Sequence, residues 1–293
     1  MSWQTIGFDK NQKLFENFIQ NGGFAHAYLF TGQEMIGKRT FAFELANHVI
    51  SGNKSQGNNP DILTVSPASS ESWHSIAIEE IRKIKKFVSL SSYVGPYKFV
   101  IIDDAHLMTI EAQNSLLKIL EEPSPSTIFI LVTANPESLL TTIVSRCQEI
   151  KFSSHPKKLI ANMLIDAKLS NKNKELLTEF ANGRLGLIKK IVEENSFDEV
   201  KDAIEEVMHL IKSDINERLA IAQKLADPSA GFAGEKNKTE LAKKILYWTL
   251  YLRTRLNEPK AHKILKNLLV LHEIINKPQF NQRLALENFL IQV

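Results

Sequence analysis

The chain has 293 residues, 43% hydrophobic and 24% charged, which predicts a globular protein of two or three domains with a sizeable core. Its formal net charge of +3 is too small for a dedicated nucleic-acid-binding protein, so any DNA contact should be local or shared with partners. The single cysteine, Cys147, excludes a disulfide framework and a multi-cysteine zinc site, and the lack of a signal-peptide core or a bilayer-length apolar run predicts a cytoplasmic protein without a membrane partner.

The first half of the sequence alternates short apolar runs with helical patterns. Runs rich in β-branched and aromatic residues occupy positions 27–31, 62–65, 99–102, 128–132 and 149–152. Helical patterns occupy positions 38–50, 78–90, 110–122 and 137–144. This alternation predicts βαβ units, and therefore a parallel sheet with helices on both faces.

The helix predicted over 110–122 carries its own start and stop signals. Thr109 is a suitable N-cap, and Glu111 lies in the first turn, where the helix dipole favours an anion. Leu116 and Leu120 repeat at helical spacing, and Pro123 ends the helix because it has no N–H to donate.

The second half of the sequence is helical in pattern. A polar, proline-containing stretch at 153–158 separates it from the first half, and turn residues at 182–183 and 227–234 interrupt it. The predicted domains are an α/β domain, a small helical domain and a second helical domain, over residues 1–153, 154–208 and 209–293.

Aromatic residues gather on one of the C-terminal helical stretches. Tyr247, Trp248 and Tyr251 are either anchors of a protein interface or core residues, and the sequence leaves both alternatives open.

A glycine-rich turn follows the first predicted strand and opens a helix. Gly32, Gly37 and Lys38 have the spacing of a phosphate-binding loop, in which backbone amides and the lysine neutralise phosphates. Magnesium needs a hydroxyl ligand at the next position, but Arg39 stands there and Thr40 comes one residue late. The alternative is a plain glycine turn with no ligand.

Two acids, Asp103 and Asp104, end the third predicted strand, at the sheet edge where ligands bind in open α/β folds. The first is placed to hold magnesium, whereas the second is one methylene shorter than the glutamate that would orient a water. The alternative is that both acids only begin a turn. Asn135, after the fourth strand, is placed as a sensor of phosphate or water, and His106 is interpreted as structural.

A Ser-Arg-Cys sequence, Ser145, Arg146 and Cys147, precedes the fifth predicted strand. The apolar pattern before it places Arg146 near the surface at a helix end. Taken alone, this arginine is best interpreted as a member of an ordinary surface salt bridge, worth less than about 1 kcal/mol.

Together these motifs resemble bacterial clamp-loader subunits of the AAA+ class, closest to the delta-prime subunits of DNA polymerase III, with gamma/tau as near relatives. The segments that carry the resemblance are HAYLFTG from His26, GKRT from Gly37, NPD from Asn59, IDDA from Ile102, NSLLKILEEP from Asn114, and SRC from Ser145. The resemblance implies an α/β AAA+ domain with a P-loop NTPase-like parallel sheet, then a small helical lid domain and an all-α collar domain.

The resemblance also implies partners and roles. The chain would join delta and gamma/tau subunits in a hetero-pentamer that loads a sliding clamp onto primed DNA. Arg146 matches the arginine finger that reaches the ATP of an adjacent subunit. Gln113 and Lys118 match a helix that faces DNA inside the loader.

Departures from the family pattern favour delta-prime over gamma/tau. Arg39 and Asp104 weaken the chain's own site, and Gly186 stands where gamma-type lids carry an arginine, with Arg184 two residues early. No cysteine occurs between positions 51 and 59, so no zinc and no other bound metal are expected. ATP and magnesium are expected only at a neighbour's site, with own nucleotide binding weak or absent.

Two alternatives remain at this point. The chain could be a gamma/tau-like ATPase that itself binds and hydrolyses ATP, as Lys38 and Asp103 would allow. It could instead be a plain scaffold in which every motif is a relic. Under the favoured hypothesis the chain is not an efficient ATPase alone but is a component of the DNA polymerase III holoenzyme.

Overall fold

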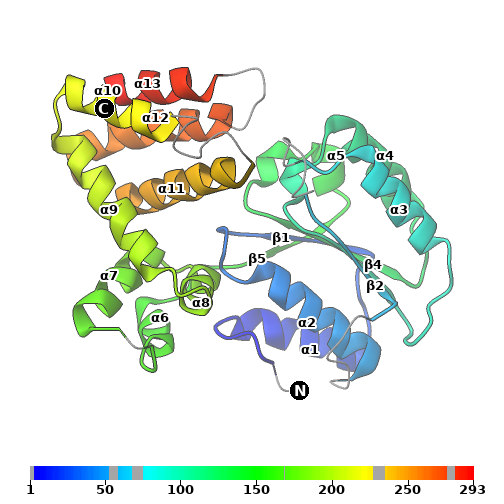
Figure 1. Cartoon of the computed structure of the whole chain (residues 1–293). Coiled ribbons are helices and arrows are strands. Elements are labelled where there is room, and N and C mark those ends of the chain that lie inside the picture. The colour runs from blue at the N-terminus through cyan, green and yellow to red at the C-terminus, as the bar shows by residue number, and fades with distance from the viewer. Residues whose placement is uncertain (1–2, 53–58, 68–74, 168, 227–234, 276–280) are drawn as a thin grey trace. The chain divides into compact units, whose positions relative to one another are not determined.

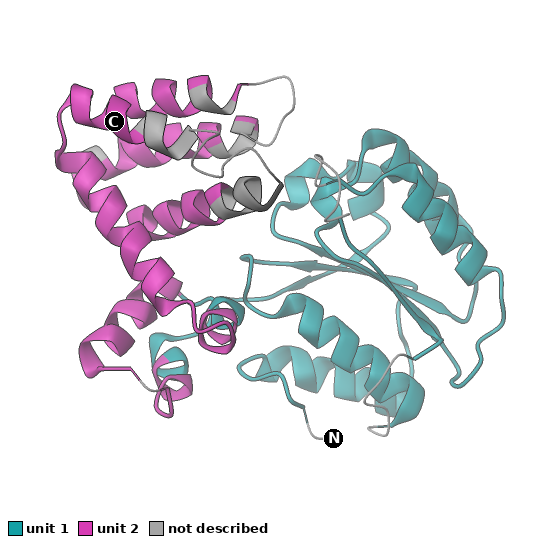
Figure 2. Cartoon of the chain, in the orientation of Figure 1, with its two compact units in different colours: residues 1–160, 183–187 teal, residues 161–182, 188–293 magenta. Residues whose placement is uncertain are grey.

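The computed structural model describes residues 3–52, 59–67, 75–167, 169–226, 235–275 and 281–293. The chain divides into two compact units (Figure 2). Unit 1 comprises residues 1–160 and 183–187, and unit 2 comprises residues 161–182 and 188–293. The short segment 183–187 therefore packs with the first half of the chain, although more than twenty residues separate this segment from residue 160.

Unit 1 is built on a five-stranded parallel sheet with helices on both faces (Figure 1). The strands are β1 (Ala27–Thr31), β2 (Ile62–Val65), β3 (Lys98–Ile102), β4 (Thr127–Thr133) and β5 (Gln148–Lys151). Their order across the sheet is β2-β3-β4-β1-β5. The turn after β1 thus lies between the ends of β4 and β5, and the predicted strands are confirmed.

The strands bury both faces, with side chains alternating between two clusters. The helices of unit 1 are α1 (Asp9–Asn21), α2 (Lys38–Ser51), α3 (Ile78–Val88), α4 (Ile110–Glu121) and α5 (Thr141–Val144). Tyr28 and Phe30 of β1 cluster with residues of α1 and α2, whereas Leu29 clusters with residues of α3 and α4. Successive side chains of a strand point to opposite faces of the sheet, and helices cover both faces. Each strand is therefore a continuous apolar run.

Most helix ends of unit 1 agree with the sequence, with two exceptions. Thr109 caps α4 by accepting the N–H of Ala112 at 3.2 Å, as predicted. The helix predicted over 137–144 is wrong in part, because a short 3-10 turn at Pro136–Ser138 is followed by extended backbone before α5. The N–H of Leu140 there donates to Gln113 Oε1 at 2.8 Å. Helix α1 is not among the predicted helices.

Asp61, the last residue of the NPD segment, has a structural role. Its carboxylate is 1% exposed and accepts the backbone N–H groups of Tyr93, Val94 and Gly95. Burial opposes ionisation, but these three donors outweigh it and hold the pKa of Asp61 below its ordinary value of 3.8. The acid therefore fixes the loop that leads into β3.

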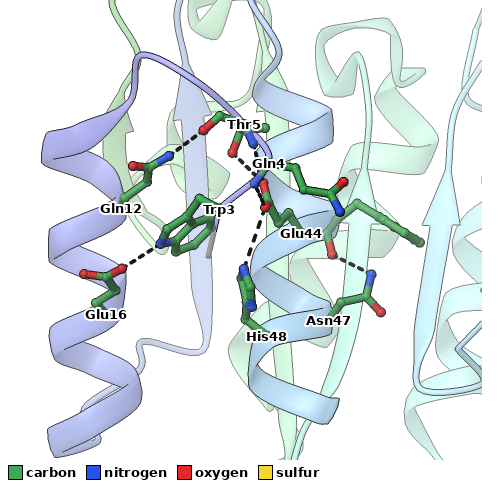
Figure 3. Close-up of polar contacts among 9 residues, drawn as sticks. Trp3, Gln4, Thr5, Gln12, Glu16, Glu44, Asn47 and His48 are labelled. Atoms are coloured by element: carbon green, nitrogen blue, oxygen red, sulfur yellow. Dashed lines mark hydrogen bonds and ion pairs between the residues drawn. The ribbon is translucent and has the colours of Figure 1, made fainter. Parts of the chain in front are cut away.

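The N-terminal segment is tied to α1 and α2 by a polar cluster (Figure 3). Glu44 accepts the backbone N–H groups of Gln4 and Thr5 and the Thr5 hydroxyl. Trp3 stacks on the Phe41 ring at 4.9 Å and donates its indole N–H to Glu16 at 2.8 Å. This attachment therefore joins the N-terminal segment to α2, the helix that begins at the glycine turn.

All the regular secondary structure among the described residues of unit 2 is helical. Its elements, counting α6 and α8 at the junctions with unit 1, are α6 (Lys157–Met163), α7 (Asn171–Ala181), α8 (Leu185–Glu193), α9 (Phe197–Lys212), α10 (Ile215–Ala226), α11 (Glu235–Thr254), α12 (Pro259–Ile275) and α13 (Gln282–Gln292). Tyr247 and Trp248 are buried, which favours the core alternative for both, whereas Tyr251 is half-buried. Within the described ranges, no helix is long and apolar enough to cross a membrane.

The structure tests only some of the predicted breaks and domain boundaries. The break at 182–183 is confirmed, since Asn182 and Gly183 both have positive φ between α7 and α8. The break predicted at 227–234 lies outside the described residues. The predicted boundary at residue 208 falls inside α9, and the division into three domains stays a prediction.

Candidate functional site

The glycine turn between β1 and α2 has the backbone that a phosphate-binding loop requires. Gly32 and Gly37 have φ values of 141° and 106°. A Cβ on Gly32 would lie 2.3 Å from the Phe152 carbonyl oxygen, so only glycine fits there. Gly37 is the N-cap of α2, and Lys38 is its first helical residue. The predicted strand–turn–helix context is therefore present.

Lys38 is turned into its own loop. Its Nζ donates to the carbonyl oxygens of Gly32 and Gln33, each at 2.7 Å, and the residue is 5% exposed. Burial lowers the pKa of Lys38 to about 8, while the negative charges of Glu34, Asp104 and Asp103 oppose that shift. A phosphate would have to compete with the loop's own carbonyls for this amine.

Arg39 forms an ion pair with Asp103. Its Nη1 lies 3.3 Å from Asp103 Oδ2. Asp103 is the acid that the sequence assigns to the metal, and a guanidinium cannot itself ligate one. Thr40, whose hydroxyl is the other candidate ligand, is exposed. Arg39 therefore competes with any magnesium ion for Asp103 Oδ2, and no hydroxyl residue directly follows Lys38.

Asp104, the second acid, and Asn135, the sensor-like asparagine, differ in their surroundings. Asp104 adopts a left-handed conformation, φ 48°, and burial together with the Asp103 charge raises its pKa. His106 Nδ1 contacts the Thr133 hydroxyl at 3.3 Å, consistent with a structural role. Asn135 is exposed, and its backbone N–H donates to the Thr133 hydroxyl at 3.0 Å.

The segment 183–187 closes over the glycine turn from within unit 1. The Gly186 N–H donates to the Met35 carbonyl oxygen at 2.7 Å, and a Cβ on Gly186 would lie 2.7 Å from that oxygen. Arg184 is 3% exposed. With the Gln33 amide oriented so that its oxygen faces Arg184, the guanidinium donates to it over 2.6 and 2.8 Å. Sequence reasoning noted both residues but did not predict this contact.

Arg146 lies at the end of α5, at the surface of unit 1, as predicted. Its Nη1 donates to the Thr142 carbonyl oxygen at 2.9 Å, and its Nη2 donates to Glu121 Oε1 at 2.8 Å. The two side chains are 35% and 50% exposed. Sequence reasoning allowed a surface salt bridge for Arg146 but did not identify Glu121 as its partner.

The neighbours of Arg146 in the Ser-Arg-Cys motif have structural contacts. The Ser145 hydroxyl donates to the Thr142 carbonyl oxygen at 3.1 Å. Cys147 is half-buried, and burial raises the pKa of its thiol to about 12. At neutral pH the thiol therefore stays protonated and is a poor nucleophile.

One of the two residues proposed to face DNA is corrected by the structure. Gln113 is 1% exposed, and its amide bonds the carbonyl oxygens of Met108 and Ser138 and the N–H of Leu140. The prediction that Gln113 faces DNA is therefore wrong, because the side chain is used inside unit 1 to join α4 to the segment before α5. Lys118, on the same helix, is exposed, and its role stays a prediction.

Metal ligands do not gather elsewhere in the part of the chain that the structure describes. Among those residues no group of three or more histidine, cysteine, aspartate or glutamate side chains is placed to hold a metal ion. The glycine turn follows β1 at the carboxyl edge of the sheet, whereas Arg146 precedes the parallel strand β5 and so lies toward the opposite edge.

Comparisons with known proteins address the first half of the chain most directly. A family model described as "DNA polymerase III, delta subunit" matches residues 8–156. The DNA polymerase III subunit delta' of Bacillus subtilis (strain 168) is 32% identical over 226 residues, which cover 72% of this chain and 66% of that protein. The subunit tau of the same bacterium is 31% identical over 182 residues, which cover 56% of this chain and 31% of that protein.

A solved structure extends the likeness to the whole chain at the level of fold. The DNA polymerase III gamma subunit-related protein from Thermotoga maritima has a TM-score of 0.57 and 21% identity, and the match covers 95% of this chain and 96% of that one. Together with the parallel sheet and the helical second half, this confirms the predicted fold class, an AAA+-type α/β domain followed by helices.

Proposed function

This chain belongs to the family of DNA polymerase III delta' clamp-loader subunits, and from that premise we propose that it supplies Arg146 to the ATP site of an adjacent loader subunit. In this role the guanidinium stabilises the charge that develops on the transferred phosphoryl group. The chain's own glycine turn contributes structure rather than ATP hydrolysis.

The observation that carries the proposal is the contrast between two basic positions. Lys38 is 5% exposed and is held by the loop carbonyls, whereas Arg39, although 57% of its side chain is exposed, pairs with Asp103 of the same chain. Arg146 keeps about a third of its side chain exposed at the end of a short helix. A charge that must reach another subunit needs an exposed position, which Lys38 lacks. Arg39 is exposed, but it lies beside an acid of this chain's own candidate site and competes there with any metal for Asp103 Oδ2.

The partners of this role follow from the family. The proposed assembly contains delta and gamma/tau subunits in a hetero-pentamer, acts in the cytoplasm, and places a sliding clamp on primed DNA. Lys118, which is exposed on α4, is proposed to add a sequence-independent phosphate contact to that DNA. The ATP and magnesium ion of the reaction belong to the adjacent subunit.

The test is Arg146→Ala in a loader reconstituted from this chain and its delta and gamma/tau partners. The proposal predicts that hydrolysis at the one ATP site facing this chain falls by about 10³-fold, in the range known for arginine fingers. In a single-turnover measurement of ATP hydrolysis, the loss of activity at that site appears as a missing fast phase. Lys38→Ala is the matched control, and it should leave every phase unchanged.

Two results would contradict the proposal. Wild-type ATPase phases in the Arg146→Ala loader would reject the finger role. Loss of a phase in the Lys38→Ala loader, together with tight binding of magnesium-ATP by the isolated chain, would favour the alternative of a self-contained gamma-type ATPase.

A further inference from the structure

Glu121 and Arg146 meet although 25 residues separate them in the sequence. Glu121 is the last residue of α4, and Arg146 follows α5 by two residues. Both belong to unit 1. The end of α4 is fixed by its sequence, because Pro123 prevents a further helical turn, and this in turn fixes where Glu121 lies.

The position of Glu121 is unfavourable unless a cation accompanies it. The C-terminal end of a helix carries partial negative charge, so an acid in the last turn is repelled there. Arg146 supplies the compensating charge, with Nη2 at 2.8 Å from Glu121 Oε1. Lys118 lies one turn earlier on α4, yet its ammonium makes no ion pair with Glu121 in the structure as described.

The guanidinium is held at two points. Besides Glu121, the carbonyl oxygen of Thr142 accepts from Nη1 at 2.9 Å. Two acceptors on a planar group fix its plane as well as its position. Of the five N–H donors of an arginine, the remaining three are left for another ligand, and 35% of the side chain is exposed.

Folding stability does not explain this arrangement, because exposed ion pairs add little to it. Orientation of the guanidinium explains it better. A mobile arginine loses rotamer freedom each time it binds a ligand, whereas an arginine that is already fixed has lost that freedom beforehand. We propose that Glu121 is the positioning residue for Arg146: together with the Thr142 carbonyl it holds the guanidinium ready for the phosphates of an adjacent subunit. This inference rests on the finger role proposed above.

The neighbouring acid offers a matched control. Glu122 is also exposed at the end of α4 and carries the same charge, but no contact joins it to Arg146 among the described residues. Glu121→Ala and Glu122→Ala therefore remove the same charge from the same helix end, and only the first removes an acceptor from the guanidinium. Glu121→Gln keeps an oxygen acceptor while it removes the charge.

The experiment measures kcat and KM for ATP in the reconstituted loader. Glu121→Ala should lower kcat at the site facing this chain by about 2- to 5-fold, the scale of an exposed pair lost from the transition state, with KM unchanged. Glu121→Gln should recover most of that loss, and Glu122→Ala should behave as wild type. In an Arg146→Ala background, Glu121→Ala should have no further effect, because the two residues act as one unit.

Several outcomes would overturn the inference. Equal effects of Glu121→Ala and Glu122→Ala would mean that only the net charge matters. A faster reaction with Glu121→Ala would mean that the acid restrains the arginine instead of positioning it. If Arg146→Ala impairs the loader and Glu121→Ala does not, only the positioning role fails. If Arg146→Ala has no effect, the finger role fails and the positioning role fails with it.

Discussion

The glycine turn and the end of α5 each pair a partly exposed arginine with an acid, but only the turn also buries a lysine against its own backbone. At the turn, Lys38 is 5% exposed and Arg39 lies on the acid that would hold a metal. At the end of α5, Arg146 pairs with an acid yet stays partly exposed. The comparison teaches that keeping a motif does not keep its chemistry, because the partners of each side chain decide what it can still bind.

The largest effect is expected from a methyl group in the glycine turn. Gly32→Ala should destabilise unit 1 by roughly 2 to 4 kcal/mol, because the positive φ disfavours alanine and its Cβ would meet the Phe152 carbonyl oxygen. Urea unfolding followed by circular dichroism measures the loss. Gly22→Ala is the control, since Gly22 also has positive φ but no atom lies near its Cβ position. Equal losses would show that the close contact costs nothing.

A smaller effect is expected from the buried amine. Burial lowers the pKa of Lys38 to about 8, below its ordinary value of 10.5, so above pH 8 the folded chain binds fewer protons here than the unfolded chain. Stability relative to a Lys38→Met variant should therefore rise by up to about 2 kcal/mol between pH 7.5 and 9.5. Hydrogen exchange of the β1 amides at the two pH values checks this. A flat difference would contradict the burial of a charged amine.

The smallest effect is expected from restoring the missing hydroxyl. Arg39→Ser should raise the affinity of the isolated chain for magnesium-ATP by about fivefold, because it removes a pair of at most about 1 kcal/mol from Asp103 and places a hydroxyl at the metal-ligand position. Titration calorimetry measures the gain. Arg39→Ala frees Asp103 without adding a hydroxyl, so the difference between the variants isolates the hydroxyl. A loss of affinity in both would mean that Arg39 itself binds phosphate, and the contrast between the two regions would weaken.

The strands and the position of the glycine turn could be predicted from sequence because each follows from local rules. Apolar runs of four or five residues, bounded by turn residues, set the sheet. The loss of a metal ligand at Arg39 also follows from residue type alone. Helix α1 was not predicted, since its sequence is mostly polar and it buries only Phe15 fully.

The contacts of the site could not be predicted, because they join residues far apart in the chain. The ends of β3 and α2 bring Asp103 to Arg39, and the ends of α4 and α5 bring Glu121 to Arg146. Gln113 is the clearest error: the family resemblance implied a DNA-facing role, but its amide bonds the carbonyl oxygens of Met108 and Ser138 and the N–H of Leu140. Only the three-dimensional path of the chain reveals such groups.

The attachment of the N-terminal segment has a practical consequence for anyone who shortens or tags this protein. Glu44 of α2 takes its donors from the backbone of Gln4 and Thr5 and from the Thr5 hydroxyl. A truncation that removes these residues would leave a partly buried carboxylate on the helix that starts at Lys38. Expression variants should therefore begin no later than Trp3. A loss of activity after trimming should not be assigned to the glycine turn before this attachment has been tested.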